Sequence, residues 1–199
     1  MAKLQWKPGT LLAPNPPVLV SCGTVDKPNA MTAAWTGIVC SEPPTTYVSI
    51  RPSRYSYGII REAGEFVINL PGEEIARAVD FCGVRSGREM DKLAACGLHA
   101  EPSRLVSAPG IAECPISLEC RVREILPLGS HDMFLAEIVA VNVDEHFVDE
   151  KGALRIERCG LLAYAHGAYF GLGKKLGTFG FSVRKKPVSR RAPRKKPKK

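Results

Sequence analysis

The fold is decided by residues 116–143, ISLECRVREILPLGSHDMFLAEIVAVNV. Apolar and polar side chains alternate over 116–123, which predicts a β-strand with one buried and one solvent-exposed face. The buried face would carry Ile116, Leu118, Cys120 and Val122, and the wet face Ser117, Glu119, Arg121 and Arg123. Turn formers follow at 127–130, and 133–143 is apolar on both faces. A strand that is apolar on both faces indicates cover by the core on one side and by a partner subunit on the other, so we expect a homodimer.

Four further extended runs precede this hairpin, and turn formers or prolines separate them. They occupy 17–24, 33–41, 45–52 and 66–71. Because turn formers at 26–29 lie between the first two runs, we expect these two to pair as a β-hairpin.

Short helical segments interrupt the strands. Ser53 is a candidate N-cap for a helix that continues to about Glu62. Helical spacing of apolar residues starts near Ile75, and a further helix is predicted over 89–96, before Gly97. The pattern lacks the strand–helix–strand rhythm of a doubly wound sheet. It therefore predicts a mainly β fold, a closed antiparallel barrel with short helical insertions.

The charge of the chain is concentrated at one end. Ten of the 28 lysines and arginines lie in 184–199, so the other residues hold 18 basic against 20 acidic side chains. This balance disfavours nucleic-acid binding by the body. Prolines without apolar periodicity predict a disordered basic tail at 184–199 after a single domain at 1–183. Non-specific contact of this tail with polyanions is expected.

The seven cysteines are scattered, without a Cys-x-x-Cys pair or clustered histidines, so we expect no metal site. The chain also lacks the apolar run of about 18 residues that a membrane span needs, and its first residues do not form a signal peptide. We therefore expect reduced thiols, a cytoplasmic protein and no membrane insertion.

Two basic segments could bind anions. Residues 49–56, SIRPSRYS, place two arginines and three serine hydroxyls, together with a tyrosine, at a strand-to-helix junction, which suits a phosphate group. A surface turn with solvated arginines explains this segment equally well. Residues 82–92 form a glycine-containing basic connection for which a plain helix–helix linker is the favoured interpretation. The glycines at 171–177 miss the dinucleotide-binding spacing and are not interpreted as such a site.

Two further positions could border a planar ligand. Residues 29–35, NAMTAAW, mix small, polar and aromatic side chains, so the backbone could approach a flat ring, although Trp35 is more commonly core. His131 follows a turn glycine, where its imidazole could titrate near neutral pH, although such a histidine is usually a surface residue.

Taken in order, these segments resemble the flavin reductase-like family, in particular its flavoredoxin-like branch. The resemblance spans about residues 11–181 and rests on PVLVS (17–21), NAMTAAW (29–35), VSIRPSRYS (48–56), FVINLP (66–71), DFCG (80–83) with Ser86-Gly87, Asp91-Lys92 and GSHD (129–132). It implies an antiparallel split β-barrel that binds FMN, with a second subunit completing the pocket. The basic tail has no counterpart in the resemblance.

Carried over to this sequence, the resemblance also implies roles for individual residues. The flavin ring would be bordered by Asn29, Met31, Thr32 and Trp35. The phosphate and ribityl chain would be held by Ser49, Arg51, Arg54 and Ser56. The cofactor would be covered by Cys82, Ser86 and Lys92, and His131 would act as the catalytic residue near the ring face.

The function that follows from this resemblance is an FMN-binding oxidoreductase. It would take reducing equivalents from NADH or NADPH and pass them to flavin or another acceptor. The alternative is a non-catalytic, flavoredoxin-like electron carrier that a partner protein reduces. The sequence does not separate the two.

Overall fold

The computed structural model describes residues 1–184, so most of the basic tail predicted at 184–199 lies outside the described residues. The strands are β1 (Val18–Gly23), β2 (Pro28–Ala33), β3 (Thr36–Ser41), β4 (Pro44–Ile50), β5 (Glu65–Leu70), β6 (Ala100–Glu101), β7 (Gly110–Ile111), β8 (Ile116–Pro127), β9 (Asp132–Val143), β10 (Leu162–Ala165) and β11 (Ala168–Gly171). The helices are α1 (Tyr55–Ala63), α2 (Ala76–Val84) and α3 (Lys92–Cys96). Short 3-10 turns are η1 (Glu73–Ile75), η2 (Glu145–Phe147), η3 (Ile156–Arg158) and η4 (Phe181–Val183).

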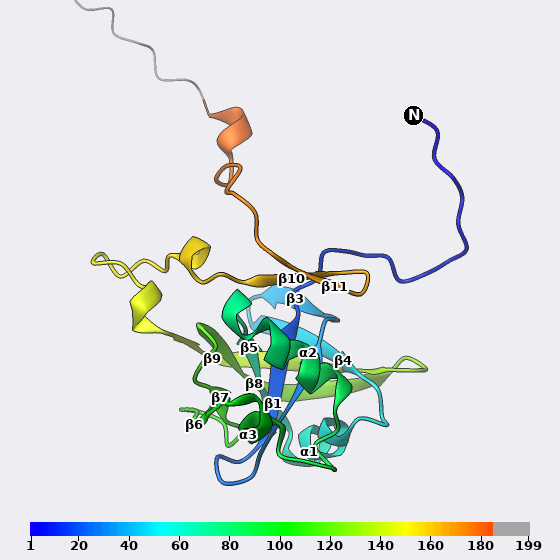
Figure 1. The fold of residues 1–199 in the computed structure, drawn as a ribbon, viewed down its shortest axis with the longest axis vertical. Helices are drawn as coiled ribbons and strands as arrows, with labels where there is room; N and C mark the ends of the chain where they lie inside the picture. The colour runs from blue at the N-terminus through cyan, green and yellow to red at the C-terminus, as the bar shows by residue number, and fades with distance from the viewer. Residues whose placement is uncertain (185–199) are drawn as a thin grey trace, which may run out of the picture.

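Seven strands form one antiparallel sheet in the order β2-β1-β5-β8-β9-β4-β3 (Figure 1). Met31 of β2 and Val48 of β4 lie far apart in this order, yet both belong to one buried cluster with Phe66 of β5. The sheet must therefore curl around this cluster, which is the interior of a split barrel. The mainly β, antiparallel fold predicted from the sequence is confirmed.

A second apolar cluster lies on the outer face of β1 and β2, under α2 and α3. Leu19 of β1 and Ala30 of β2 pack there against Val79 of α2 and Leu93 of α3. Figure 1 shows α2 and α3 in front of β1, while α1 lies at the lower end of the barrel. Since β1 and β2 have core on both faces, their side chains do not alternate in polarity.

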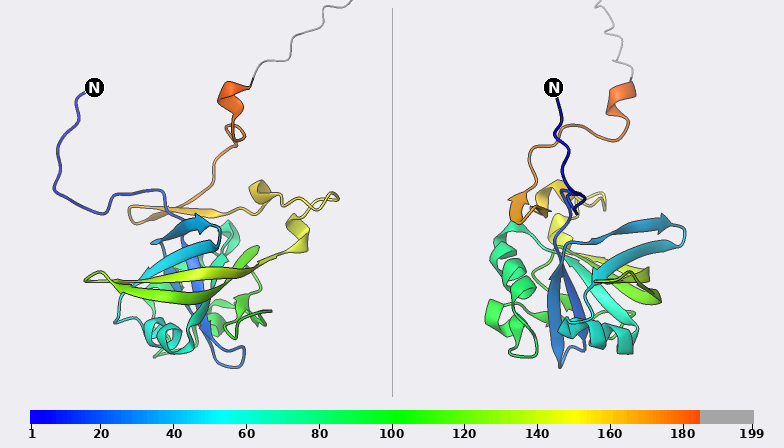
Figure 2. Two further views of the ribbon diagram at one scale, coloured as in Figure 1. Left: turned by 180° about the vertical axis from the view of Figure 1, so that it is seen from behind. Right: turned by 90° about the vertical axis from the view of Figure 1, so that its right-hand side faces the viewer.

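The predicted pairing of the first two extended runs is wrong. β1 pairs with β2, a strand that the sequence analysis interpreted as turn and connection, with Val18 opposite Ala33 and Gly23 opposite Pro28. β3 instead pairs with β4 at the other edge of the sheet, and this hairpin projects beyond the body (Figure 2). The sequence analysis assigned Pro28 to a turn, but proline is also tolerated as the first residue of an edge strand.

The long hairpin of β8 and β9 is confirmed, but half of its predicted wet face is buried. Glu119 is fully buried, and its carboxylate accepts hydrogen bonds from the backbone nitrogens of Arg104 (2.9 Å) and Leu105 (2.7 Å). The loop at 102–109 covers this part of the sheet, and these bonds compensate for burying a charge. Arg121 and Arg123 are exposed, as predicted.

Two predicted helix starts also differ from the structure. Ser53 does not cap α1: Arg54 is the N-cap residue, and it makes no side-chain capping bond. The helix predicted over 89–96 begins only at Lys92, because the Asp91 carboxylate caps it by accepting from the backbone nitrogen of Ala94. Its end at Gly97, in the left-handed conformation with φ 67°, is as predicted.

Two segments extend from one end of the body. The β10–β11 hairpin forms its own two-stranded sheet beside them. Residues 1–16 and 172–184 leave the body on the same side (Figures 1 and 2). Among residues 1–184, no helix combines the length and apolar character needed to cross a bilayer.

Candidate functional site

Two adjoining cavities open between the barrel and the α2–α3 region. The first has a volume of about 470 Å³ and the second about 460 Å³. Met31, Arg51 and Arg54 line both, so the two cavities form one continuous cleft. The arginines come from the turn between β4 and α1, where the backbone nitrogen of Arg54 donates to the carbonyl of Arg51 (3.0 Å).

The second cavity is strongly cationic. Its charged lining is Arg51, Arg54, Arg85, Arg88 and Lys92 against the single carboxylate of Glu89, with hydroxyls from Ser53, Ser56 and Ser86. None of the ion pairs found within residues 1–184 involves any of these five basic side chains. Because long cationic side chains gathered around one space repel each other, an anion bound there would be strongly favoured.

Lys92 is the most unusual of these basic residues, since its side chain is only 4% exposed. Its Nζ donates to the carbonyl oxygens of Cys82 (3.1 Å) and Arg85 (3.2 Å). Burial lowers the pKa of Lys92, and the positive charge of Arg54 lowers it further. A buried ammonium that has carbonyl partners but, among residues 1–184, no carboxylate partner is held at a cost, and an incoming anion would offset it.

The loop between α2 and α3 is shaped by a close contact with β2. A Cβ at Gly87 would overlap Oδ1 of Asn29. The amide of Asn29 in turn donates to the hydroxyl of Ser56 (2.7 Å), at the start of α1. Arg88 lies over the ring of Tyr55, 5.7 Å from its centroid. These contacts fix the basic loop against the first turn of α1.

The first cavity carries an aromatic pair. The rings of Trp35 and His131 have centroids 4.5 Å apart at a tilt of 44°. Trp35 is 40% exposed and is therefore not core. Burial, followed by the charges of Arg51 and Arg54, lowers the pKa of His131 from its usual 6.5. The imidazole is thus neutral at pH 7, and its Nδ1 lies 2.9 Å from the Ser130 hydroxyl.

Most residues that the sequence analysis predicted for the site are brought together. Met31, Thr32, Trp35, Ser49, Arg51, Arg54 and His131 line the first cavity, and Ser56, Ser86 and Lys92 line the second. Asn29 and Cys82 line neither. Asn29 is buried and supports Ser56, while burial raises the pKa of the Cys82 thiol to about 12 and its carbonyl holds Lys92.

The sequence analysis missed the residues that close the other side of the first cavity. These are Asp80 of α2, Tyr164 of β10 and Tyr169 of β11. The two tyrosines are directly opposite each other across the hairpin turn at His166-Gly167. That dipeptide between two short apolar runs was an available turn signal, but nothing local to it indicates a ligand. Within residues 1–184, no group of three or more His, Cys, Asp or Glu could hold a metal ion.

Comparison with known proteins assigns this geometry to a family. The family model described as flavin reductase like domain matches residues 11–173. Flavoredoxin of Desulfovibrio vulgaris (Miyazaki F) is 33% identical with a TM-score of 0.85, over 92% of this chain and 100% of that one. A flavoredoxin from Methanosarcina acetivorans is 28% identical with a TM-score of 0.83, over the same shares of both chains. An FMN-binding protein from Thermus thermophilus is 26% identical with a TM-score of 0.73, over 89% of this chain and 98% of that one.

These matches cover nearly all of the described body, including both cavities. The chain therefore belongs to the flavin reductase-like family, in its flavoredoxin-like branch.

Proposed function

We propose that this protein binds FMN along the continuous cleft and transfers reducing equivalents from NADH or NADPH to flavin or another acceptor. Membership of the flavin reductase-like family gives it a flavin-related redox function. The observation that carries the FMN proposal is the buried Lys92 ammonium, which has no acidic partner among the described residues and lies beside Arg51 and Arg54 on one cavity.

The residues of the second cavity fit a phosphate monoester. Such a group carries a charge of about −1.5 to −2 near neutral pH and three acceptor oxygens. Arg51 and Arg54 offer forked donors, Lys92 a point charge, and Ser56 and Ser86 hydroxyls. The five basic side chains would exceed the charge of one phosphate, so an uncharged ligand of similar shape would not substitute for it.

The first cavity fits a planar ring. Met31, Thr32 and the exposed indole of Trp35 provide a partly apolar wall next to the cationic cavity. Thr32 is held in place because its hydroxyl donates to the carbonyl of Val79 in α2. When bound, flavin supplies the hydride and electron chemistry, while the protein supplies position and access.

His131 is proposed to act as a neutral hydrogen-bond donor at the ring. In the tautomer whose Nδ1 accepts from the Ser130 hydroxyl, Nε2 carries the ring proton and can donate a hydrogen bond into the cavity. Asp132, the next residue, accepts from the hydroxyl of Tyr57 (2.6 Å). This bond ties the start of β9 to α1 and so fixes the position of His131.

The test of FMN binding compares two ligands that differ by the phosphate. The double variant Arg51→Ala/Arg54→Ala should bind FMN at least a hundredfold more weakly, because two charge-assisted contacts are lost. Riboflavin, measured in the same fluorescence titration, should change by less than threefold. Arg61→Ala, which removes an arginine in the last turn of α1 outside both cavities, is the matched control. Equal losses for both ligands would refute the phosphate site.

A second candidate function is that of an electron carrier without NAD(P)H activity. The observation that favours it is the similarity to two flavoredoxins, each covered over 100% of its length. Anaerobic mixing of the FMN-loaded protein with NADH or NADPH separates the two functions. Bleaching of the flavin absorbance within seconds supports the oxidoreductase, whereas no bleaching with either nucleotide, and reduction only by a partner protein, supports the carrier.

We also propose a homodimer in which the outer face of β9 meets a second copy. Val141 on this strand is 58% exposed, whereas Val139 packs against the chain's own loop through Val106 and Ala108. Val141→Asp is therefore the cleaner test. Sedimentation of the FMN-loaded wild type should give a dimer and the variant a monomer, while a wild-type monomer with bound FMN would refute the proposal.

A further inference from the structure

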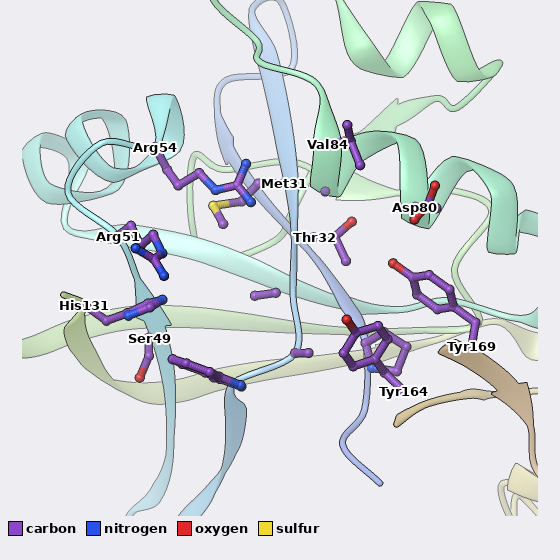
Figure 3. Close-up of a pocket in the computed structure, with 15 residues that line it drawn as sticks. Met31, Thr32, Ser49, Arg51, Arg54, Asp80, Val84, His131, Tyr164 and Tyr169 are labelled. Carbon is purple, nitrogen blue, oxygen red and sulfur yellow. The ribbon is translucent and has the colours of Figure 1, made fainter. Parts of the chain in front are cut away.

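The first cavity has a second polar end that the FMN proposal does not use. Figure 3 shows Arg51, Arg54 and His131 on one side and Asp80, Tyr164 and Tyr169 on the other, with Met31 and Thr32 between them. We call these two sides the arginine end (Arg51, Arg54) and the tyrosine end (Asp80, Tyr164, Tyr169). The arginine end is positively charged, and the tyrosine end carries one carboxylate.

The tyrosine end is held in place although its hairpin does not pair with the main sheet. The backbone nitrogen of Tyr164 donates to the carbonyl of Asn15 (2.8 Å), and the nitrogen of Asn15 donates to the carbonyl of Tyr164 (2.9 Å). Just before β10, the carbonyl of Gly160 accepts from the backbone nitrogen of Glu73 (2.9 Å). An isolated two-stranded hairpin is marginally stable, so these bonds on both sides fix the position of the tyrosines.

The tyrosine end offers hydrogen-bond acceptors, namely one carboxylate and two phenol oxygens. The rings of Tyr164 and Tyr169 meet edge to face, with centroids 5.2 Å apart. The hydroxyl of Tyr169 points toward the Asp80 carboxylate (Figure 3). Burial, followed by the charge of Asp80, raises the pKa of Tyr169 to about 12, so its phenol stays protonated near neutral pH. Among the described residues, no basic group pairs with Asp80 within 4.0 Å.

We propose that Asp80, Tyr164 and Tyr169 form a subsite for a planar group that carries N–H donors, namely the carboxamide of a reduced nicotinamide ring. The inference rests on the proposed function, because it names the second ligand of the same cleft. A carboxamide NH₂ matches the carboxylate and phenol oxygens, and its flat ring suits the tyrosine faces. The negative charge of Asp80 opposes a phosphate, which the arginine end attracts instead. The cleft therefore orients its two ligands by charge.

The subsite is tested with full-length, FMN-loaded protein and a redox-inert probe that keeps the carboxamide, 1,4,5,6-tetrahydronicotinamide adenine dinucleotide. Calorimetry should show binding about tenfold weaker in Asp80→Ala and about threefold weaker in Tyr164→Phe, because a hydrogen bond to a charged group contributes more than one to a neutral group. Arg77→Ala is the matched control, since Arg77 is exposed on the same helix and lines neither cavity.

A second measurement isolates the N–H donor. Stopped-flow reduction compares NADH with reduced 3-acetylpyridine adenine dinucleotide, in which a methyl ketone replaces the carboxamide. The wild type should favour NADH, and Asp80→Ala should lose most of that preference while its affinity for FMN stays within twofold of the wild type.

Three outcomes overturn the proposal. The first is wild-type affinity for the inert probe in both Asp80→Ala and Tyr164→Phe. The second is a tenfold loss of FMN affinity in these variants, which would mean that the subsite holds the flavin ring itself. The third is an FMN-loaded wild type that does not bind the probe. That result would overturn the subsite without contradicting FMN binding. A wild type that takes up no FMN would instead refute the proposed function, and this subsite with it.

Discussion

The two ends of the first cavity reach the same space from different parts of the chain. Arg51 and Arg54 come from a single turn and continue into a second cationic cavity. Asp80, Tyr164 and Tyr169 come from a helix and a separate hairpin that is tied down by Asn15 and Glu73. The arginine end consists of charged side chains that are close together in the sequence. The tyrosine end consists of a carboxylate and two hydroxyl groups that tertiary contacts bring together. Affinity at the arginine end should therefore be large and salt-sensitive, and recognition at the tyrosine end should depend on geometry.

Among single substitutions on the cationic side, the largest effect is expected from Lys92→Met, which keeps most of the length of the side chain and removes its charge. FMN affinity should fall about thirtyfold, or about 2 kcal/mol, because a desolvated charge-assisted contact is lost. Fluorescence titration measures the loss, and riboflavin affinity should change little. Wild-type FMN affinity in this variant would mean that Lys92 only holds the α2–α3 loop through Cys82 and Arg85.

A smaller effect is expected from Gly87→Ala, which tests how the basic loop is shaped. The added methyl would overlap Oδ1 of Asn29 and disturb the bond from Asn29 to Ser56. The free energy of unfolding should fall by about 1 to 2 kcal/mol, with a severalfold loss of FMN affinity. Gly58→Ala is the matched control, because a Cβ there meets nothing within 4 Å and alanine favours the α1 helix. Equal denaturation midpoints for the two variants would contradict the close contact.

The arginine end could be anticipated from the sequence more readily than the tyrosine end, for a physical reason. Arg51 and Arg54 lie within eight residues at a strand-to-helix junction, so their clustering is visible in the chain. Tyr164 and Asp80 are 84 positions apart and meet only because residues 160–164 are tied to Glu73 and Asn15. Short-range patterns carry no information about such contacts. The buried state of Glu119 escaped prediction in the same way, since a loop distant from β8 supplies its hydrogen bonds.

Edge strands were a second limit on prediction from sequence. β2 begins with Pro28-Asn29, which are turn formers, and its residues are buried on both faces, so it shows neither composition nor alternation typical of a strand. β8, by contrast, was recognised from its alternation and its position in a long hairpin. The overall fold was thus predictable from β8 and β9, whereas the pairing of β1 depended on tertiary context.

A subtler effect should appear in the pKa of His131, which reports on the arginine end. Burial and the charges of Arg51 and Arg54 lower this pKa in the free protein. A bound phosphate dianion offsets those charges, so the pKa of His131 should rise on FMN binding. NMR titration of the imidazole with and without FMN measures this rise, and riboflavin is the control that lacks the phosphate. A pKa that falls on binding would place the phosphate elsewhere.

The smallest effect on FMN binding is expected from removing residues 185–199. This truncation tests whether the basic residues of that segment contribute to FMN binding in addition to those that line the cleft. Among residues 1–184, the five basic side chains that line the cationic cavity lie between Arg51 and Lys92, so we expect that cavity to bind FMN without the segment. FMN affinity and melting temperature should therefore stay within experimental error after truncation. Retention on heparin should fall, because each Lys or Arg that neutralises a phosphate adds about 0.7 to 0.9 to the salt slope of polyanion binding. Heparin elution and FMN titration should both be measured on the full-length and the truncated protein at the same ionic strength. Loss of FMN from the truncated form would show that the terminal charges reach the cleft, and the two sets of charge would then have to be treated as one.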